Sequence, residues 1–207
     1  MSRPTFYFMA KQHTVIVLHI AIADITPQVW RRLVVDSDIS LRALHHIIQA
    51  AFGWNSAHLH DFRIGGKNYC MMDNDHIVEG NIGREDDIFD DRKGKLNRLL
   101  YPGQRFTYQY DFGDSWEHEV EVERIEAVPE PMGAAAIVDG ARACPPEDIG
   151  GPWGYSEILK ALKIKPRNDQ AREFLEWVGG KFDPELFDQR AANAALSRMA
   201  WNRWGQK

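Results

Sequence analysis

The chain has 207 residues, 44% of them hydrophobic and 27% charged, and its formal net charge is −5. This composition is typical of a globular protein, and the acidic balance argues against nonspecific binding to duplex DNA, which needs a basic face. The two cysteines, Cys70 and Cys144, form no C-x-x-C pair, which fits a reducing cytoplasm. The longest apolar run, residues 15–23, is too short to span a bilayer. We therefore expect a soluble cytoplasmic protein with no membrane partner.

The beginning of the chain predicts two strands and a helix. Residues 15–22 are rich in β-branched side chains and predict a buried strand, and residues 29–35 predict its hairpin partner. Apolar residues then recur at helical spacing. This helix is expected to start at the N-cap Ser40 and to run to about Phe52, with Gly53 ending it.

The next part of the chain is less regular. Residues 58–64 and 67–72 predict two strands joined by a glycine turn. Residues 73–91 are acidic and predict a solvated loop, with a short strand at 77–78. Leucines within residues 96–100 predict a single helical turn.

A β-hairpin is predicted over residues 106–120. Aromatic residues alternate along its first strand, which predicts one shared face for Phe106, Tyr108, Tyr110 and Phe112. Gly113-Asp114 predicts a two-residue turn with glycine first. The return strand predicts an inward row of Trp116, His118, Val120 and Val122, and an acidic row facing water of Glu117, Glu119, Glu121 and Glu123.

The last third of the chain predicts loops and helices. Residues 129–143 lack periodicity and predict a flexible loop. Residues 144–155 predict a proline-rich, rigid loop that ends where a helix starts, with Pro152 at the first helical position. Two more helices are predicted, one at 169–178 and one from its cap Asp183 to about residue 204.

These elements predict an α+β fold. Its centre is a curved antiparallel sheet, open or closing toward a barrel, packed by the helix at 40–52. A helical C-terminal region follows. We expect one domain over residues 1–207, with a sheet-plus-helix core at 13–128 and the loop and C-terminal helices at 144–204.

Several segments carry a family resemblance: Ser40–Gln49, Phe52-Gly-Trp54, His58-Leu-His60, Tyr110–His118, Cys144–Gly151, and Trp177 with Phe182-Asp-Pro184. In these segments the chain resembles the plasmid pRiA4b ORF-3-like family, also labelled an insertion-element passenger protein of TnpR type. The match covers roughly residues 13–195. The resemblance implies an α+β fold carried often on plasmids and mobile elements. It implies no reaction, and the sequence has no recombinase chemistry that would support a resolvase-like label.

A metal site is the first functional hypothesis. His58 and His60 are two residues apart, so on a strand both imidazoles would emerge from one face. A shell of His and carboxylate ligands of the kind that zinc, iron or manganese uses would be completed by His45, His118, Glu147 and Asp148. A divalent metal is the cofactor that this set suggests. The alternative is that these histidines hydrogen-bond the proline-rich loop and hold it in place.

A catalytic site at the hairpin turn is the second hypothesis. Asp111 and Asp114 lie close to His118 in the sequence, and carboxylates beside a histidine can perform general acid–base chemistry. The alternative is that both aspartates hydrogen-bond turn amides. The residues expected to surround a ligand here are His45, Trp54, Glu147, Asp148 and Trp153.

Nucleic-acid binding is the third hypothesis. The last predicted helix carries basic and aromatic residues, namely Arg190, Arg198, Trp201, Arg203, Trp204 and Lys207. No catalytic motif in the chain is complete, so we expect a non-enzymatic binding or accessory module. The alternatives are a metal-dependent hydrolase and a nucleic-acid-associated recombination accessory protein.

Overall fold

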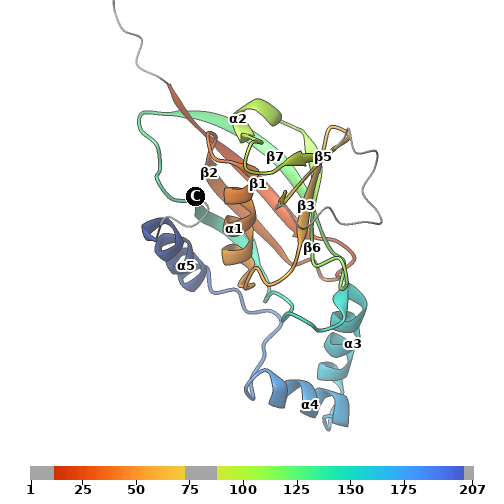
Figure 1. The fold of residues 1–207 in the computed structure, drawn as a ribbon. Helices are drawn as coiled ribbons and strands as arrows, with labels where there is room; N and C mark the ends of the chain where they lie inside the picture. Colours follow the sequence, from red (N-terminus) through yellow and green to blue (C-terminus); the bar gives the residue numbers. More distant parts are fainter. Residues whose placement is uncertain (1–11, 73–87, 203–207) are drawn as a thin grey trace, which may run out of the picture.

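The computed structural model describes residues 12–72 and 88–202, and it has the α+β architecture that the sequence predicts (Figure 1). The strands are β1 (His13–Ile22), β2 (Trp30–Asp36), β3 (His60–Ile64), β4 (Lys67–Cys70), β5 (Ile88–Asp90), β6 (Arg105–Tyr110), β7 (Trp116–Val128) and β8 (Ala136–Ala141). The helices are α1 (Leu41–Phe52), α2 (Leu96–Leu99), α3 (Gly151–Lys163), α4 (Asp169–Trp177) and α5 (Gln189–Trp201).

The described strands form one curved sheet in the order β5-β4-β3-β6-β7-β1-β2-β8. β5 and β8 lie at its two ends and do not pair with each other, so of the two predicted alternatives the sheet is the open one and does not close toward a barrel. Neighbouring strands are antiparallel except for β4 and β5, which are parallel. No helix among the described residues is both long and apolar enough to cross a bilayer.

Helix α1 packs on one face of the sheet and fills the core (Figure 1). It starts as predicted, because the Ser40 Oγ accepts a hydrogen bond from the Ala43 amide at 3.2 Å. It ends at Gly53, whose φ of 88° is left-handed. Its inward residues Leu44 and Ile48 are fully buried. Burial of each such side chain stabilises the fold by roughly 1.5–3 kcal/mol.

The β6–β7 hairpin confirms the predicted core face but not the predicted turn. Tyr108, Trp116 and the other inward residues of both strands are buried. Tyr110 pairs with Trp116, so the turn spans the five residues 111–115 rather than two. Phe112 therefore belongs to the turn, and with 36% exposure it does not share the aromatic face. The reason is local, since the Asp111 Oδ1 accepts the Gly113 amide at 3.0 Å and bends the backbone early.

The acidic row of β7 lies opposite the core face. Its residues do not simply face water, because three of them pair with arginines of other strands, one on the adjacent β6 and two on β3 and β2, each two strands away. The ion pairs join Arg63 to Glu117 at 3.7 Å, Arg105 to Glu121 at 2.8 Å and Arg32 to Glu123 at 2.9 Å. The carboxylates thus form cross-strand pairs on this face.

The segment predicted as a flexible loop at 129–143 contains the edge strand β8, which pairs with β2. Ile137 of β8 is buried, and its backbone N–H and C=O both bond the Asn193 side chain of α5 at 2.9 Å. The register shifts between Arg32 and Leu33 of β2. A bulged edge strand with a glycine shows no period-two pattern, so the loop prediction was wrong.

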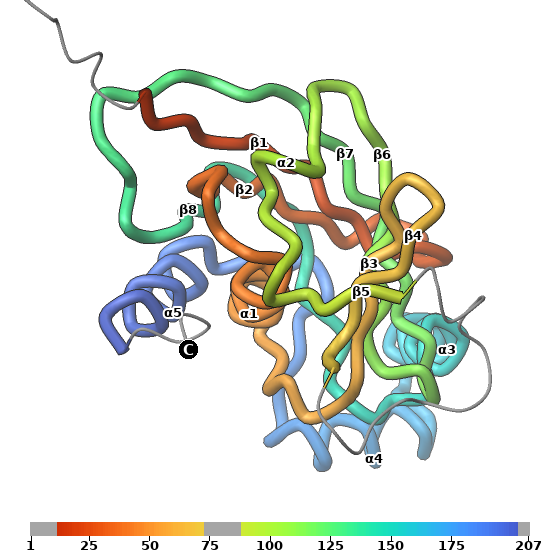
Figure 2. Tube along the Cα trace, turned by 45° about the horizontal axis from the view of Figure 1, so that its top comes forward, coloured from red at the N-terminus to blue at the C-terminus, as the bar shows by residue number. Residues whose placement is uncertain are grey.

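The C-terminal helices follow the prediction in number but not at every boundary. Helix α5 starts after its cap Asp188, whose Oδ1 accepts the Ala191 amide, and not at Asp183. Asp183 instead accepts the Glu185 amide in a turn. Pro152 is the second residue of α3, and α4 matches its prediction closely. Figure 2 shows α5 beside α1, while α3 and α4 lie together at another end of the molecule.

Within the acidic segment, residues 88–90 form β5 rather than loop. This three-residue strand pairs in parallel with β4, and no local sequence pattern predicts this pairing. The strand predicted at 77–78 lies outside the described residues.

Candidate functional site

Three segments that are distant in the sequence meet at the β6–β7 turn: the residues after α1, the turn itself and the loop before α3. The Asp114 Oδ2 accepts the Gly150 amide at 3.1 Å. A Cβ on Gly151 would lie 2.3 Å from the Asp114 carbonyl oxygen, so only glycine fits there. From the other side, the Trp54 indole donates to the Pro145 carbonyl at 2.9 Å. A hydrogen bond and a close backbone contact therefore hold the 144–151 loop against the hairpin turn.

A histidine and three carboxylates converge at this junction. The His58 Nε2 lies 3.6 Å from an oxygen of Asp111, 3.7 Å from one of Glu147 and 3.4 Å from one of Asp148. We call these four residues the His58 cluster. The ligand atoms of His58, Asp111 and Asp148 all lie within 4.8 Å of one another. The Asp148 side chain is 72% exposed, so the cluster is open to solvent on that side.

Glu147 and Asp111 are the less exposed carboxylates of the His58 cluster. In each of them one oxygen accepts hydrogen bonds that hold the side chain in place, and the other oxygen points toward His58. The Glu147 Oε1 accepts the Asn55 amide at 2.6 Å and the Tyr110 hydroxyl at 3.2 Å, which leaves Oε2 toward His58. The Asp111 Oδ1 accepts two turn amides and leaves Oδ2 toward His58. Burial, and then the charge of Glu147, raise the pKa of Tyr110 well above its usual range, so this hydroxyl stays protonated and can donate. Metal ligands in proteins are oriented by outer contacts of this kind.

The backbone around the His58 cluster adopts a conformation that L-residues seldom take. Asp111 has a φ of 54° and Asp148 one of 59°, and Ser56 near His58 has one of 56°. Aspartate tolerates this left-handed region better than most residues, at a cost in free energy. Such conformations gather at functional sites, where surrounding contacts maintain them.

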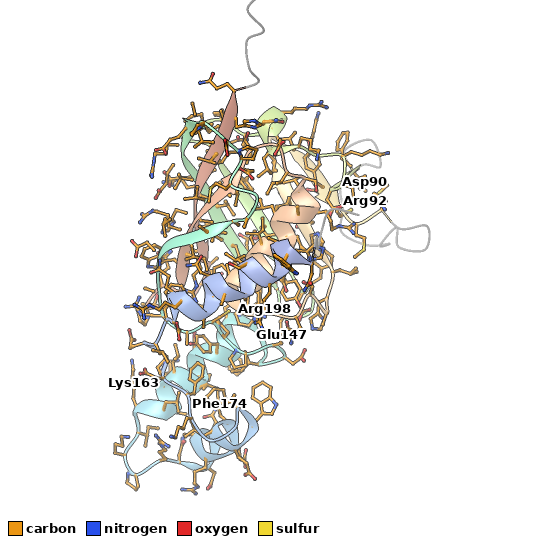
Figure 3. All side chains as sticks on the ribbon, turned by 90° about the vertical axis from the view of Figure 1, so that its left-hand side faces the viewer. Asp90, Arg92, Glu147, Lys163, Phe174 and Arg198 are labelled. Carbon is orange, nitrogen blue, oxygen red and sulfur yellow. The ribbon has the colours of Figure 1, made fainter. Side chains whose placement is uncertain are left out.

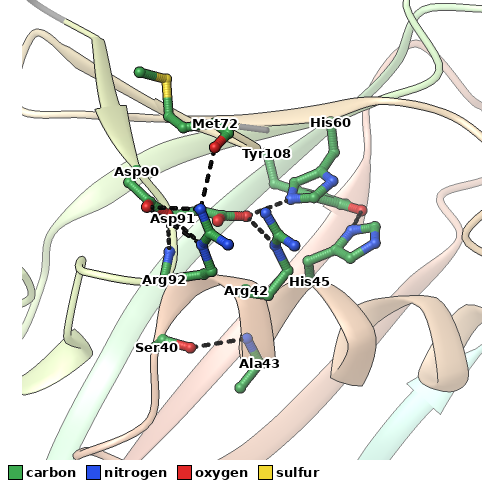
Figure 4. A network of polar contacts seen from close by, with 10 residues as sticks. All are labelled: Ser40, Arg42, Ala43, His45, His60, Met72, Asp90, Asp91, Arg92 and Tyr108. Atoms are coloured by element: carbon green, nitrogen blue, oxygen red, sulfur yellow. Dashed lines mark hydrogen bonds and ion pairs between the residues drawn. The ribbon is translucent and has the colours of Figure 1, made fainter. Parts of the chain in front are cut away.

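His60 does not join His58, and the expectation that both emerge from one strand face is wrong. β3 begins at His60, so His58 lies in the preceding bend and the period of two does not apply. The His60 side chain is 1% exposed, and its Nε2 lies 2.9 Å from the Asp91 Oδ2. That oxygen also accepts a hydrogen bond of 2.7 Å from the Arg42 Nε, and Figure 4 shows both contacts.

His45 belongs to the same buried network as His60. Its Nδ1 lies 2.7 Å from the hydroxyl of Tyr108, which also accepts the Gln49 amide at 3.0 Å (Figure 4). Burial lowers the pKa of His45 well below its usual value. His45 thus contacts the core network rather than the His58 cluster.

The three residues predicted as catalytic have different environments. Asp111 faces His58, whereas Asp114 accepts the Gly150 amide. His118 is fully buried on the core face, with its Nδ1 3.1 Å from the Trp116 carbonyl, and burial lowers its pKa to about 4. The ring packs edge-on against Trp54 with centroids 5.3 Å apart, so His118 is a buried packing residue of the core. Trp54 is itself buried, whereas Trp153 on α3 is 76% exposed.

The predicted basic-aromatic surface of the last helix is described only in part. Arg190 and Arg198 are exposed on α5, and Trp201 is 88% exposed. Arg203, Trp204 and Lys207 lie outside the described residues. Nothing in this arrangement adds support for nucleic-acid binding.

Two contributors to these networks were missed in the sequence. Asp91 lies in the acidic segment that predicts a solvated loop, yet its side chain is fully buried. Tyr110 was assigned only to the core, although its hydroxyl positions Glu147. No local pattern distinguishes Asp91 from its acidic neighbours, because its burial depends on distant Arg42 and His60.

Comparison with known proteins extends over nearly the whole chain. A family model described as "Plasmid pRiA4b ORF-3-like protein" matches residues 14–191. The "Uncharacterized protein y4hQ" of Sinorhizobium fredii is 34% identical over 196 residues, which are 94% of this chain and 96% of that protein. A crystal structure of the "Protein of Unknown Function MM3350" from Methanosarcina mazei Go1 is similar with a TM-score of 0.75 at 32% identity, covering 86% of this chain and 97% of the other.

Proposed function

Since this chain belongs to the plasmid pRiA4b ORF-3-like family, whose matched relatives carry no activity in their names, we propose that it is a non-enzymatic binding module organised by a divalent metal ion in the His58 cluster. The distances of 3.4–3.7 Å from the His58 Nε2 to three carboxylate oxygens carry this proposal. Ligands about 2.1 Å from a tetrahedral ion lie roughly 3.4 Å apart, close to this spacing.

The donor set favours particular metals. One imidazole nitrogen and carboxylate oxygens suit zinc, manganese or iron. Calcium prefers oxygen ligands alone, and copper(I) prefers sulfur. Zinc and manganese are therefore the ions to test first.

An ion here would have a clear mechanical effect. It would join the segment after α1, the hairpin turn and the 147–148 loop, which are connected otherwise by hydrogen bonds such as the one from Asn55 to Glu147. It would also neutralise part of the charge of three neighbouring carboxylates. The metal would fix the surface of which Asp148 forms part, and no chemical step is needed for that role.

A metal-dependent hydrolase is the second candidate. The 72% exposure of the Asp148 side chain favours it, because an ion open to solvent on that side would hold a water molecule. The link to mobile elements and the cytoplasmic location are expectations that follow from the family resemblance and the cysteine content.

The test measures metal on protein without a histidine tag. We expect about one equivalent of zinc or manganese by mass spectrometry or equilibrium dialysis, and at least tenfold weaker binding in Asp148→Asn. Asparagine accepts the left-handed backbone, so this variant should fold. The matched control is Asp169→Asn, an 84% exposed aspartate on α4.

Three outcomes separate the candidates. Absence of metal binding in the wild-type protein contradicts both of them. Metal binding without turnover of generic phosphoester or peptide substrates supports the binding module. Turnover that Asp148→Asn abolishes and Asp169→Asn preserves would establish the hydrolase instead.

A further inference from the structure

A shallow groove lies next to the His58 cluster, between helices α3 and α4. Its walls include two tryptophans that the fold leaves in solvent, Trp153 at 76% exposure and Trp177 at 56%. Asp148 lines the groove as well and so belongs to both places. In Figure 3, Phe174 marks this region and Glu147 marks the neighbouring cluster. Exposed tryptophans in one groove are typical of a recognition surface, because they offer large apolar area at small entropic cost.

The floor of the groove is preformed. Ile158, Phe174 and Leu175 form a small buried core between α3 and α4, separate from the main core. The Phe174 ring meets Trp177 edge-on at 6.2 Å and supports it from below. A ligand would therefore meet walls that are already in place, which lowers the entropic cost of binding.

The charge of the groove selects the ligand. Three carboxylates line it, from Asp148, Glu157 and Glu173, and none of the described lining residues is Lys, Arg or His. Glu157 pairs with Lys160 at 2.7 Å, so it is partly neutralised. The remaining charge is negative. Indole faces attract guanidinium and ammonium groups, and carboxylates hydrogen-bond them.

We propose that this groove binds an arginine- or lysine-bearing segment of a partner protein. A basic side chain stacks on Trp153 or Trp177, and Glu173 and Asp148 bind its charge. Nucleic acid is the wrong partner for this groove, since its phosphates would meet three carboxylates. The groove shares Asp148 with the His58 cluster, but the peptide proposal does not require an ion, because both tryptophans and Glu173 lie outside that cluster.

The experiment is an NMR titration of the full chain labelled with ¹⁵N, read at the indole N–H signals. The probe is a nine-residue peptide of alternating arginine and serine. We expect saturable shifts of the Trp153 and Trp177 signals and no shift of the Trp201 signal. The double variant Trp153→Ala/Trp177→Ala should bind the peptide at least tenfold more weakly. The matched control Trp201→Ala, which removes an indole that is 88% exposed on α5, should bind normally.

Several results would overturn this inference. They are the absence of a saturable shift at the two tryptophans, equal binding of a glutamate-serine peptide of the same length, and a loss in Trp201→Ala that matches the double variant. A larger shift of the Trp153 and Trp177 signals with single-stranded oligothymidine than with the peptide would show that the groove binds nucleic acid and not a basic protein segment. Repeating the titration with EDTA distinguishes this inference from the metal proposal, because peptide binding should persist when the metal ion is removed.

Discussion

The imidazole rings of His45 and His60 stack face to face inside the protein, with centroids 3.6 Å apart and planes within 6° of parallel. His45 comes from α1 and His60 from β3, so the stack joins the main helix to the sheet. Asp91 and Arg42 complete the network around His60. Burial, and after it electrostatic repulsion from His60, His46 and Arg42, lowers the pKa of His45.

The first prediction is a loss of stability on mild acidification. His45 and His118 have lowered pKa values in the folded protein, so the unfolded chain binds their protons first as the pH falls. Their contribution is therefore complete above pH ~6.5 and decreases below it, by up to about 1.4 kcal/mol per pH unit for each residue. For His118 the decrease continues to its folded pKa of about 4. Urea unfolding between pH 7.5 and 5.5 measures this, and a constant free energy of unfolding would contradict it.

The second prediction concerns the buried carboxylate Asp91. Asp91→Asn leaves Arg42 without its buried counter-charge, so the free energy of unfolding should fall by about 3–5 kcal/mol. The matched control is Asp139→Asn. Asp139 pairs with Arg32 but is 55% exposed, and its loss should cost less than about 1 kcal/mol. Similar values for both variants in urea would show that the buried network does not stabilise the fold.

The third prediction tests the close contact between the hairpin turn and the 144–151 loop. Gly151 and Gly133 have nearly the same φ, 68° and 69°, but only at Gly151 would an added Cβ meet another segment. Gly133→Ala should cost about 1–2 kcal/mol from backbone strain. Gly151→Ala should cost roughly a further 1–3 kcal/mol, because its Cβ would overlap the Asp114 carbonyl. Chemical denaturation compares the two, and equal losses would rule out the close contact.

The fourth prediction follows from linkage between metal binding and folding. A zinc ion bound only by the folded protein should stabilise it by about 2.7 kcal/mol at a hundred times the dissociation constant. For a chain of this size that is a rise in melting temperature of roughly 5–10 °C. Asp148→Asn should lose most of the rise and Asp169→Asn should keep it. Scanning calorimetry with and without zinc provides the measurement, and an equal rise in both variants would point to binding elsewhere.

Much of the fold follows from local sequence patterns. The alternation of apolar and acidic residues at period two correctly predicted the inward row of β7 from Trp116 to Val122, which is buried in the structure. Helical spacing and end signals correctly placed α1 between Ser40 and Gly53. These predictions succeed because a side chain's direction in a strand or helix is set by its own backbone.

The sequence by itself determined the fold class, the two strands of the β6–β7 hairpin, the main helix and the family. Only the tertiary structure decided which candidate ligands meet: His58 joins Asp111, Glu147 and Asp148, while His60 turns to Asp91. The physical reason is that these contacts join segments far apart in the chain. Their geometry depends on strand order and on the close contact of Gly151 with the hairpin turn, and residue spacing along the chain encodes neither.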